Sequence, residues 1–228
     1  MKWLNHLLDI IYPKSCEGCK EALLGGENLI CTKCLIELPR TNSHIYPIEE
    51  IEKKFWGKIR VANTITYMKF SKKGIVQSLL HALKYRDKPE LGTYLGELYG
   101  KELKEVNFDK KIDLIIGIPL NQEKEKQRGY NQANFIAEGL SKALNVPFDT
   151  DATQRVINTS TQTKKGRMER FNNVNEAFEI IDNAMIRNKR IAIVDDVLTT
   201  GATIESFGKA LLDSGCSEIS VITMATAY

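Results

Sequence analysis

The sequence has no long hydrophobic run, because none of its apolar stretches approaches the ~20 residues that a helix needs to cross a bilayer. Near the N-terminus, polar residues interrupt the apolar positions Leu4, Leu7, Leu8 and Ile11, and no small-residue cleavage site of a signal peptide follows. Their spacing places them on one face of a short helix that we expect to dock on the rest of the protein. We therefore expect a cytoplasmic protein without a membrane span.

A strong charge imbalance is also missing. The 228 residues include 32 lysines and arginines against 29 acids, which leaves a formal net charge of +3. This balance does not demand a polyanionic partner, so a nucleic-acid site has to come from local basic patches. The hydrophobic content of 43% and the charged content of 27% exclude a disordered chain. The length allows one α/β domain with a small appendage, which we assign to residues 46–228 and 1–45.

Cysteine is scarce, and four of the five cysteines lie close together. They form two Cys-x-x-Cys pairs, Cys16 with Cys19 and Cys31 with Cys34, while Cys216 stands alone and is expected to be a buried thiol. In a reducing compartment, clustered cysteines are metal ligands more often than disulfides. Two such pairs give the tetrahedral sulfur cage that zinc prefers, with no open position for catalysis. We predict a structural zinc in a zinc-ribbon or treble-clef module; two disulfides or four free thiols are the alternative.

The rest of the chain shows alternating strand and helix patterns. A β-rich strand is expected at 62–70, followed by helices that begin at Gly74 and Pro89. From residue 112 the pattern predicts, in order, a strand at 112–118, a helix at 133–144, a strand at 190–194, a helix at 203–214 and a strand at 219–224. This alternation indicates an α/β fold with a mainly parallel sheet flanked by helices.

The segment after the strand at 190–194 carries the chemistry of an anion site. Asp195 and Asp196 follow this strand, at the carboxyl end where open α/β sheets bind ligands. Gly201 and small side chains let backbone amides converge at a helix start, which favours an anion. A ribose 5-phosphate fits if its hydroxyls donate to the two carboxylates and its phosphate contacts Thr199, Thr200, Gly201, Ala202 and Thr203. A strand-turn-helix with a solvated acidic cap is the alternative reading.

Two further segments are candidates for binding a pyrophosphate group. The first segment follows the end of the strand at 112–118 and carries basic side chains that can neutralise polyphosphate. These candidate residues are Pro119, Leu120, Asn121, Lys124, Lys126 and Arg128. The second segment is the long polar stretch at 155–178, a length that indicates a functional lid or a linker. Its basic residues include Arg167 and Arg170, and a solvated charged loop is the alternative.

The acid pair and the Thr-rich loop resemble the signature of type I phosphoribosyltransferases. The whole order of motifs resembles the ComF family of competence proteins, which share that fold and carry an N-terminal zinc module. The residues that carry the resemblance are the four cysteines, 83–86 (LKYR), Pro119, Leu120, 128–132 (RGYNQ), Gln162, Arg170, Asn173, 177–178 and 195–203. The resemblance implies a type I phosphoribosyltransferase-like fold, phosphoribosyl diphosphate with Mg2+ as the ligand, and a role in DNA uptake during natural transformation. It does not establish a reaction.

Two functions remain open from the sequence. The first is a phosphoribosyltransferase in which Asp195, Asp196, Arg167 and Arg170 act on the ribose and the departing pyrophosphate. The second is a non-catalytic competence module that binds single-stranded DNA and uses phosphoribosyl diphosphate as an effector or not at all, with other competence proteins as partners. Its candidate contacts are Lys84, Arg155, Lys164 and Lys165, and its possible stacking residues Tyr85, Tyr130 and Phe171 are expected to serve mainly in packing.

Overall fold

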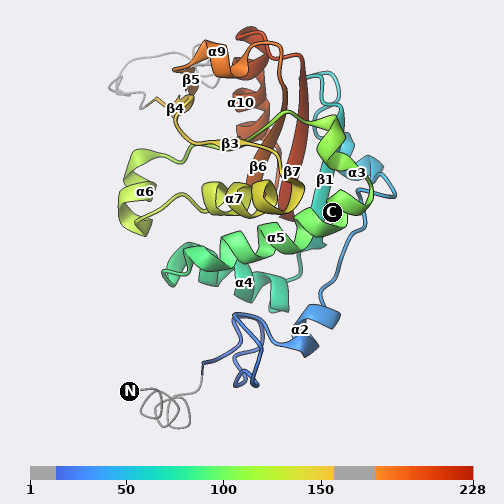
Figure 1. Cartoon of the computed structure of the whole chain (residues 1–228), viewed down its shortest axis with the longest axis vertical. Helices are drawn as coiled ribbons and strands as arrows, with labels where there is room; N and C mark the ends of the chain where they lie inside the picture. Colours follow the sequence, from blue (N-terminus) through green and yellow to red (C-terminus); the bar gives the residue numbers. More distant parts are fainter. Residues whose placement is uncertain (1–13, 157–177, 228) are drawn as a thin grey trace.

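A parallel sheet of five strands forms the centre of the computed structural model, which describes residues 14–156 and 178–227 (Figure 1). The strand order is β1-β7-β6-β2-β3, and every neighbouring pair is parallel. The strands are β1 (Asn63–Lys69), β2 (Leu114–Gly117), β3 (Phe148–Asp149), β6 (Arg190–Leu198) and β7 (Glu218–Thr226). The predicted α/β class and the parallel sheet are therefore confirmed. The helix expected over Leu4 to Ile11 lies outside the described residues.

Helices cover both faces of this sheet. One face packs against α4 (Ile75–Tyr85), α5 (Pro89–Glu105) and α7 (Gln132–Leu144), and the other against α10 (Ala202–Asp213) and the short α3 (Glu49–Glu52). Successive residues of β6 alternate between the two cores, because side chains along a strand point to opposite faces. Ala192 and Val194 face the α4–α5–α7 side, and Ile191 and Ile193 face α10. This alternation decides where the two acids that follow can point.

The crossing of α5 and α7 is unusually close. A Cβ atom at Gly139 would collide with the carbonyl oxygen of Thr93, and one at Gly96 with the carbonyl oxygen of Ile136. Glycine is therefore required at this crossing, which fixes the helix pair beside β2. The remaining described elements are α2 (Thr32–Ile36), η1 (Phe108–Lys111), α6 (Gln122–Arg128), α9 (Asn183–Ile186) and an antiparallel pair, β4 (Thr153–Arg155) with β5 (Phe178–Ile180).

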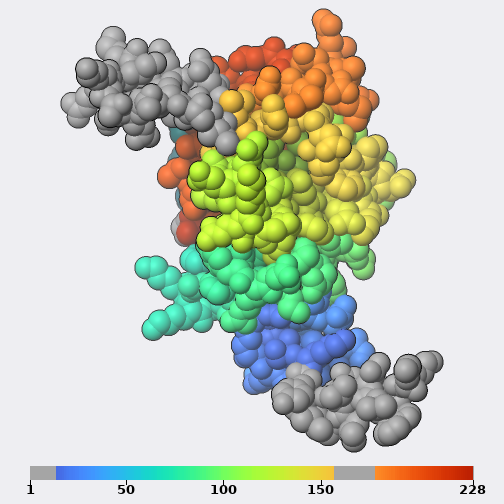
Figure 2. All heavy atoms as spheres, turned by 90° about the vertical axis from the view of Figure 1, so that its left-hand side faces the viewer, coloured from blue at the N-terminus to red at the C-terminus, as the bar shows by residue number. Residues whose placement is uncertain are grey.

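The cysteine-containing segment lies beneath α4, as both views of the molecule show (Figures 1 and 2). Three of its cysteines belong to the same hydrophobic core as the buried residues of α4. The chain then runs along the edge of β1, where the amide of Thr41 donates to the carbonyl oxygen of Tyr67 at 2.9 Å. Ser43 Oγ likewise donates to the carbonyl oxygen of Thr66 at 3.0 Å. The segment before the predicted boundary at residue 45 is thus fixed to the sheet.

One prediction about β6 was wrong in its extent. The strand was expected to end at Val194, but it continues to Leu198, so that Asp195 and Asp196 lie within it. The reason is its neighbour β7, which pairs with β6 as far as Leu198 and Thr226. On the other side β2 ends opposite Val194, so no described strand pairs with this edge of β6 at the two acids. No helix among the described residues has the length and apolar character needed to span a bilayer.

Candidate functional site

Asp195 and the Thr-rich loop meet at a small pocket of about 210 Å3 including its open mouth, which we call the loop pocket. Asp195 lines it together with Val197, Leu198 and residues 199–204. The loop leads into α10, a helix of twelve residues whose N-cap is Gly201. Asp195 continues the α10-facing side of the strand, so its carboxylate shares a pocket with the loop. The sequence-based prediction that these residues converge holds for Asp195 and for Thr199, Thr200, Gly201, Ala202 and Thr203.

Two residues that sequence reasoning missed support this loop from the segment after α3. Lys54 Nζ donates to the carbonyl oxygen of Thr199 at 2.6 Å. Phe55 lies against Gly201, where a Cβ atom would come within 3.0 Å of Phe55 Cε1. Gly201 also has a φ of +82°, a backbone conformation that other residues rarely adopt. The conformation of the loop is therefore stabilised by contacts with Lys54 and Phe55 as well as by its own glycine.

Asp196 lies on the opposite face of the strand from Asp195. Its side chain is buried, with 5% of the residue exposed. Its Oδ2 lies 2.9 Å from Nζ of Lys84, the penultimate residue of α4. This contact is an ion pair without hydrogen-bond geometry, because Oδ2 accepts no hydrogen bond. Lys84, predicted as a nucleic-acid contact, forms an ion pair with Asp196 in the structure. Its place could not be predicted because the pairing spans residues far apart in the sequence.

Asp195 carries a strongly perturbed carboxyl group. Burial is the largest cause, followed by the negative charge of Asp196, and together they raise the pKa of Asp195 from 3.8 to about 7. The amide of Asp196, which donates to Asp195 Oδ1 at 2.8 Å, and the positive charges of Lys84 and Arg155 oppose this rise. Perturbed carboxyl groups of this kind are typical of functional sites. Near neutral pH this group can gain or lose a proton.

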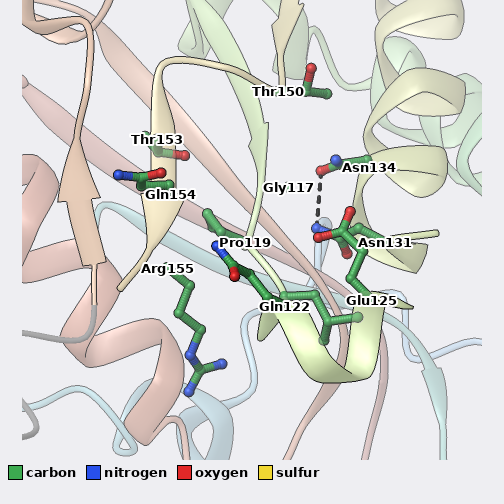
Figure 3. Close-up of a pocket in the computed structure, with 11 residues that line it drawn as sticks. Gly117, Pro119, Gln122, Glu125, Asn131, Asn134, Thr150, Thr153, Gln154 and Arg155 are labelled. Carbon is green, nitrogen blue, oxygen red and sulfur yellow. Dashed lines mark hydrogen bonds between the residues drawn. The ribbon is translucent and has the colours of Figure 1, made fainter. Parts of the chain in front are cut away.

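A second pocket, of about 570 Å3 including its open mouth, lies beside the ends of β2 and β3 (Figure 3). Thr153, Gln154 and Arg155 of β4 lie on one side, and Asn131, the N-cap of α7, lies with Asn134 of that helix on the other. The remaining lining residues are Gly117, Pro119, Leu120, Gln122, Glu125 and Thr150. We call this the amide pocket, because amide and hydroxyl side chains dominate its lining. Of the predicted pyrophosphate residues, Pro119 and Leu120 line it.

The other predicted pyrophosphate residues do not line the amide pocket. Asn121 caps α6, accepting from the amide of Glu123 at 3.0 Å. Lys124 and Lys126 are exposed on α6. Arg128 Nη1 donates to Gln132 Oε1 at 2.8 Å, and its guanidinium lies 5.5 Å from the centre of the Tyr85 ring. Short α6 thus directs its cations away from this pocket.

The motif at 128–132 has a structural role that its sequence did not reveal. The buried Tyr130 hydroxyl donates to the carbonyl oxygen of Leu83 and so joins the start of α7 to the end of α4. Asn131 Nδ2 donates to the carbonyl oxygen of Ile118 at 2.9 Å, and Asn131 Oδ1 caps α7 through the amide of Ala133. Packing was expected for Tyr130 and is confirmed. Tyr85 differs from that expectation, because it is 64% exposed.

The remaining predicted residues divide between the described chain and the segment outside it. Arg155 lies in β4, with its guanidinium 5.2 Å from the centre of the Phe178 ring. The strands β4 and β5 pair at the two ends of the stretch at 155–178. Lys164, Lys165, Arg167, Arg170 and Phe171 lie outside the described residues.

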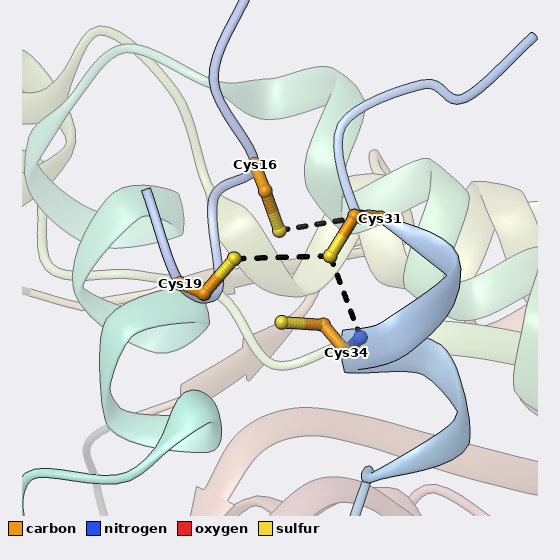
Figure 4. Close-up of side chains that lie close together, drawn as sticks. All are labelled: Cys16, Cys19, Cys31 and Cys34. Atoms are coloured by element: carbon orange, nitrogen blue, oxygen red, sulfur yellow. Dashed lines mark hydrogen bonds between the residues drawn. The ribbon is translucent and has the colours of Figure 1, made fainter. Parts of the chain in front are cut away.

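The four predicted metal ligands converge. The sulfur atoms of Cys16, Cys19, Cys31 and Cys34 all lie within 4.8 Å of one another (Figure 4), and none of the four forms a disulfide. The amides of Gly18 and Cys31 donate to Cys16 Sγ at 3.3 and 3.2 Å. Burial alone would raise the pKa of Cys16, but backbone amides outweigh it and lower the pKa to about 7. A thiol of this kind readily supplies the thiolate that metal ions bind.

Comparison with known proteins identifies the fold family. A family model described as the phosphoribosyl transferase domain matches residues 84–227, which is more than half of the chain. The chain belongs to the phosphoribosyl transferase domain family. In this family member, the matched region begins at Lys84 and includes both pockets, while the cysteine cluster, α3 and β1 precede it.

Three curated relatives confirm the resemblance to ComF proteins. The DNA utilization protein YhgH of Shigella flexneri is 28% identical over 209 residues, covering 90% of this chain and 87% of that protein. Competence protein ComFC of Bacillus subtilis is 24% identical over 206 residues, covering 85% and 82%. Competence protein F of Haemophilus influenzae is 34% identical over 128 residues, covering 56% of each chain.

Proposed function

We propose that this chain binds 5-phosphoribosyl 1-diphosphate and transfers its phosphoribosyl group to an acceptor, with release of pyrophosphate, in support of DNA uptake. The observation that carries the proposal is the pocket shared by Asp195 and residues 199–204 at the start of α10. The 5-phosphate accepts from the loop amides and threonine hydroxyls, where a helix start favours an anion. The ribose hydroxyls donate to the carboxylates of Asp195 and Asp196.

The amide pocket receives the diphosphate in this proposal. It opens at the ends of β2 and β3, beside the free edge of β6, and Arg155 supplies a cation for phosphate oxygens. Mg2+, which prefers hard oxygen ligands, would neutralise the diphosphate oxygens. When the bond from ribose C1 to the diphosphate oxygen breaks, the electron pair leaves with pyrophosphate and the ring becomes oxocarbenium-like. The acids then offset the positive charge on the ring, and the acceptor adds to C1.

Calorimetry with phosphoribosyl diphosphate and Mg2+, followed by a pyrophosphate-release assay with candidate acceptors, tests this function. We expect binding by the unaltered protein and pyrophosphate release with one acceptor class. Lys142→Ala is a suitable control, because Lys142 forms its ion pair with Glu138 on the outer surface of α7. Absence of binding would refute the ligand, and binding without release with any acceptor would refute catalysis.

We also propose that the four cysteines hold a structural zinc. Tetrahedral Zn–S bonds of ~2.3 Å place sulfur atoms ~3.8 Å apart, and Cys19 Sγ and Cys31 Sγ are separated by 3.7 Å. Four thiolates leave no position for substrate, so the ion stabilises the fold. Elemental analysis of the purified protein should find one zinc per chain, and Cys31→Ser should lower the zinc content and the unfolding temperature. A full-length protein that folds equally well without metal contradicts this assignment.

Single-stranded DNA is a second candidate ligand, favoured by the exposed Tyr85. Its ring lies 5.0 Å from that of His81 and 5.5 Å from the guanidinium of Arg128, an arrangement of aromatic and basic groups on which bases can stack. Binding should weaken with salt, and Tyr85→Ala should cost ~1–3 kcal/mol per stacked base. Tyr46→Ala, at a tyrosine that is 71% exposed elsewhere, is the control. Equal binding by the two variants would exclude this face.

A further inference from the structure

Lys84 and Asp196 form an ion pair in which the carboxylate is almost completely buried. Asp196 is 5% exposed, and the ammonium of Lys84 lies 2.9 Å from its Oδ2. A buried carboxylate is costly unless a cation accompanies it, so the pair satisfies a requirement of burial. Yet Oδ2 accepts no hydrogen bond from any described group. The charge of Asp196 is therefore balanced by the ammonium of Lys84.

The position of Lys84 is fixed by three contacts at the two ends of α4. Tyr130 donates its hydroxyl hydrogen to the carbonyl oxygen of Leu83, the residue immediately before Lys84. Arg86 Nη1 lies 3.8 Å from Glu17 Oε2 within the cysteine module. At the other end of the helix, Ile75 packs so closely on Gly18 that an added Cβ atom would lie 3.0 Å from Ile75 Cγ2. Contacts thus hold both ends of α4, and Lys84, near its C-terminal end, pairs with Asp196 of β6.

We propose that Lys84 is a positioning residue of the sugar-phosphate site, which balances the charge of Asp196 and fixes the orientation of the carboxylate that accepts a ligand hydroxyl. The inference rests on the proposed function, because the hydroxyl is that of a ribose phosphate. An ionised carboxylate only accepts hydrogen bonds, and a ribose hydroxyl can donate one. The two acids then differ in their surroundings. Asp195 lines the loop pocket, whereas the charge of Asp196 is balanced by Lys84 of α4.

The chain offers variants that separate this role from general stability. Lys84→Met keeps much of the side-chain length and removes the charge, while Lys84→Arg keeps the charge. Lys88→Met is the matched control, because Lys88 follows α4 and pairs with Glu90 on the surface. Calorimetry with phosphoribosyl diphosphate and Mg2+ should find binding weakened by about tenfold or more in Lys84→Met. Lys84→Arg should recover most of this loss, and Lys88→Met should bind as the unaltered protein does.

Thermal unfolding without ligand provides a second, independent measurement. Lys84→Met leaves the buried carboxylate unpaired and should lower the unfolding temperature. Adding Asp196→Asn removes the carboxylate charge, so the double variant should unfold at a higher temperature than Lys84→Met alone.

The outcomes distinguish this inference from the proposed function. If the unaltered protein binds the ligand and Lys84→Met binds it equally well, the role of Lys84 is refuted and the function stands. If the unaltered protein does not bind, the proposed function fails, and with it the ligand-positioning role. In that case the unfolding measurements decide only whether the ion pair exists. If the effects of Lys84→Met and Asp196→Asn on the unfolding temperature are additive, the ion pair is refuted as well.

Discussion

Two pockets lie along the carboxyl edge of the sheet, and the chain builds them differently. The residues that line the loop pocket, Asp195 and 197–204, come from one short stretch of the chain. The amide pocket combines the end of β2, α6, the start of α7 and the strand β4, which are separated in the sequence. A local motif can specify the first by its own order of residues. The second exists only after the fold has brought its parts together.

The largest expected effect concerns the loop pocket. Asp195→Asn combined with Asp196→Asn replaces two charged carboxylates by neutral amides, each with a single, weaker acceptor oxygen, and the binding of phosphoribosyl diphosphate should fall by more than about a hundredfold. Calorimetry measures this loss, and circular dichroism checks that the variant is folded. Retention of affinity within threefold would mean that the sugar lies elsewhere.

A smaller effect is expected when the loop backbone is altered. Gly201→Ala places a side chain at a φ of +82° and against Phe55, so it should cost ~1–2 kcal/mol of stability and weaken ligand binding. Gly129→Ala is the control, because Gly129 has a φ of +81° with no neighbouring atom within 4 Å of an added Cβ. Denaturant unfolding should therefore show a greater loss for Gly201→Ala. Equal losses would mean that the contact with Phe55 contributes nothing.

Arg155→Met tests whether the amide pocket has a separate role. It should weaken phosphoribosyl diphosphate by about tenfold, because a charged contact to the diphosphate is lost. Ribose 5-phosphate lacks the diphosphate, so its affinity should stay unchanged. Parallel titrations with the two ligands check this. Equal weakening of both would remove the distinction between the pockets.

The raised pKa of Asp195 predicts opposite effects of pH on binding and on stability. Because the pKa is about 7 in the folded protein against an ordinary 3.8, the folded state binds the proton more tightly. The contribution of Asp195 to stability should therefore decrease as pH rises from about 4 to 7. Its ability to accept ribose hydroxyls should increase through pH 7. Binding and unfolding measured at pH 6 and 8 should each show a smaller pH dependence in Asp195→Asn than in the unaltered protein.

The smallest expected effect concerns the lysines of α6. Lys124→Ala with Lys126→Ala should change ligand affinity by less than about threefold, because both side chains are exposed and neither lines the amide pocket. The comparison with Arg155→Met is the informative one. A larger loss from the lysine pair than from Arg155→Met would restore the pyrophosphate role that the sequence suggested for them.

The accuracy of the sequence-based predictions follows the same division. The sheet, its main helices, the cysteine cluster and the loop at 199–203 depend on hydrophobic periodicity and short motifs, and they could be predicted. The supporting contacts of Lys54 and Phe55, and the pairing of Lys84 with Asp196, join residues more than a hundred positions apart. No local pattern encodes such pairings. The extent of β6 was missed for a similar reason, since its last residues depend on hydrogen bonding to β7.

Backbone amide chemical shifts on addition of ribose 5-phosphate test the central claim most directly. If the 5-phosphate lies at the start of α10, the amides of residues 200–203 should shift strongly, with a smaller change at Asp195 and none at Lys124 or Lys126. A titration that leaves residues 200–203 unchanged, or that shifts α6 instead, would contradict the assignment of this loop as the phosphate site.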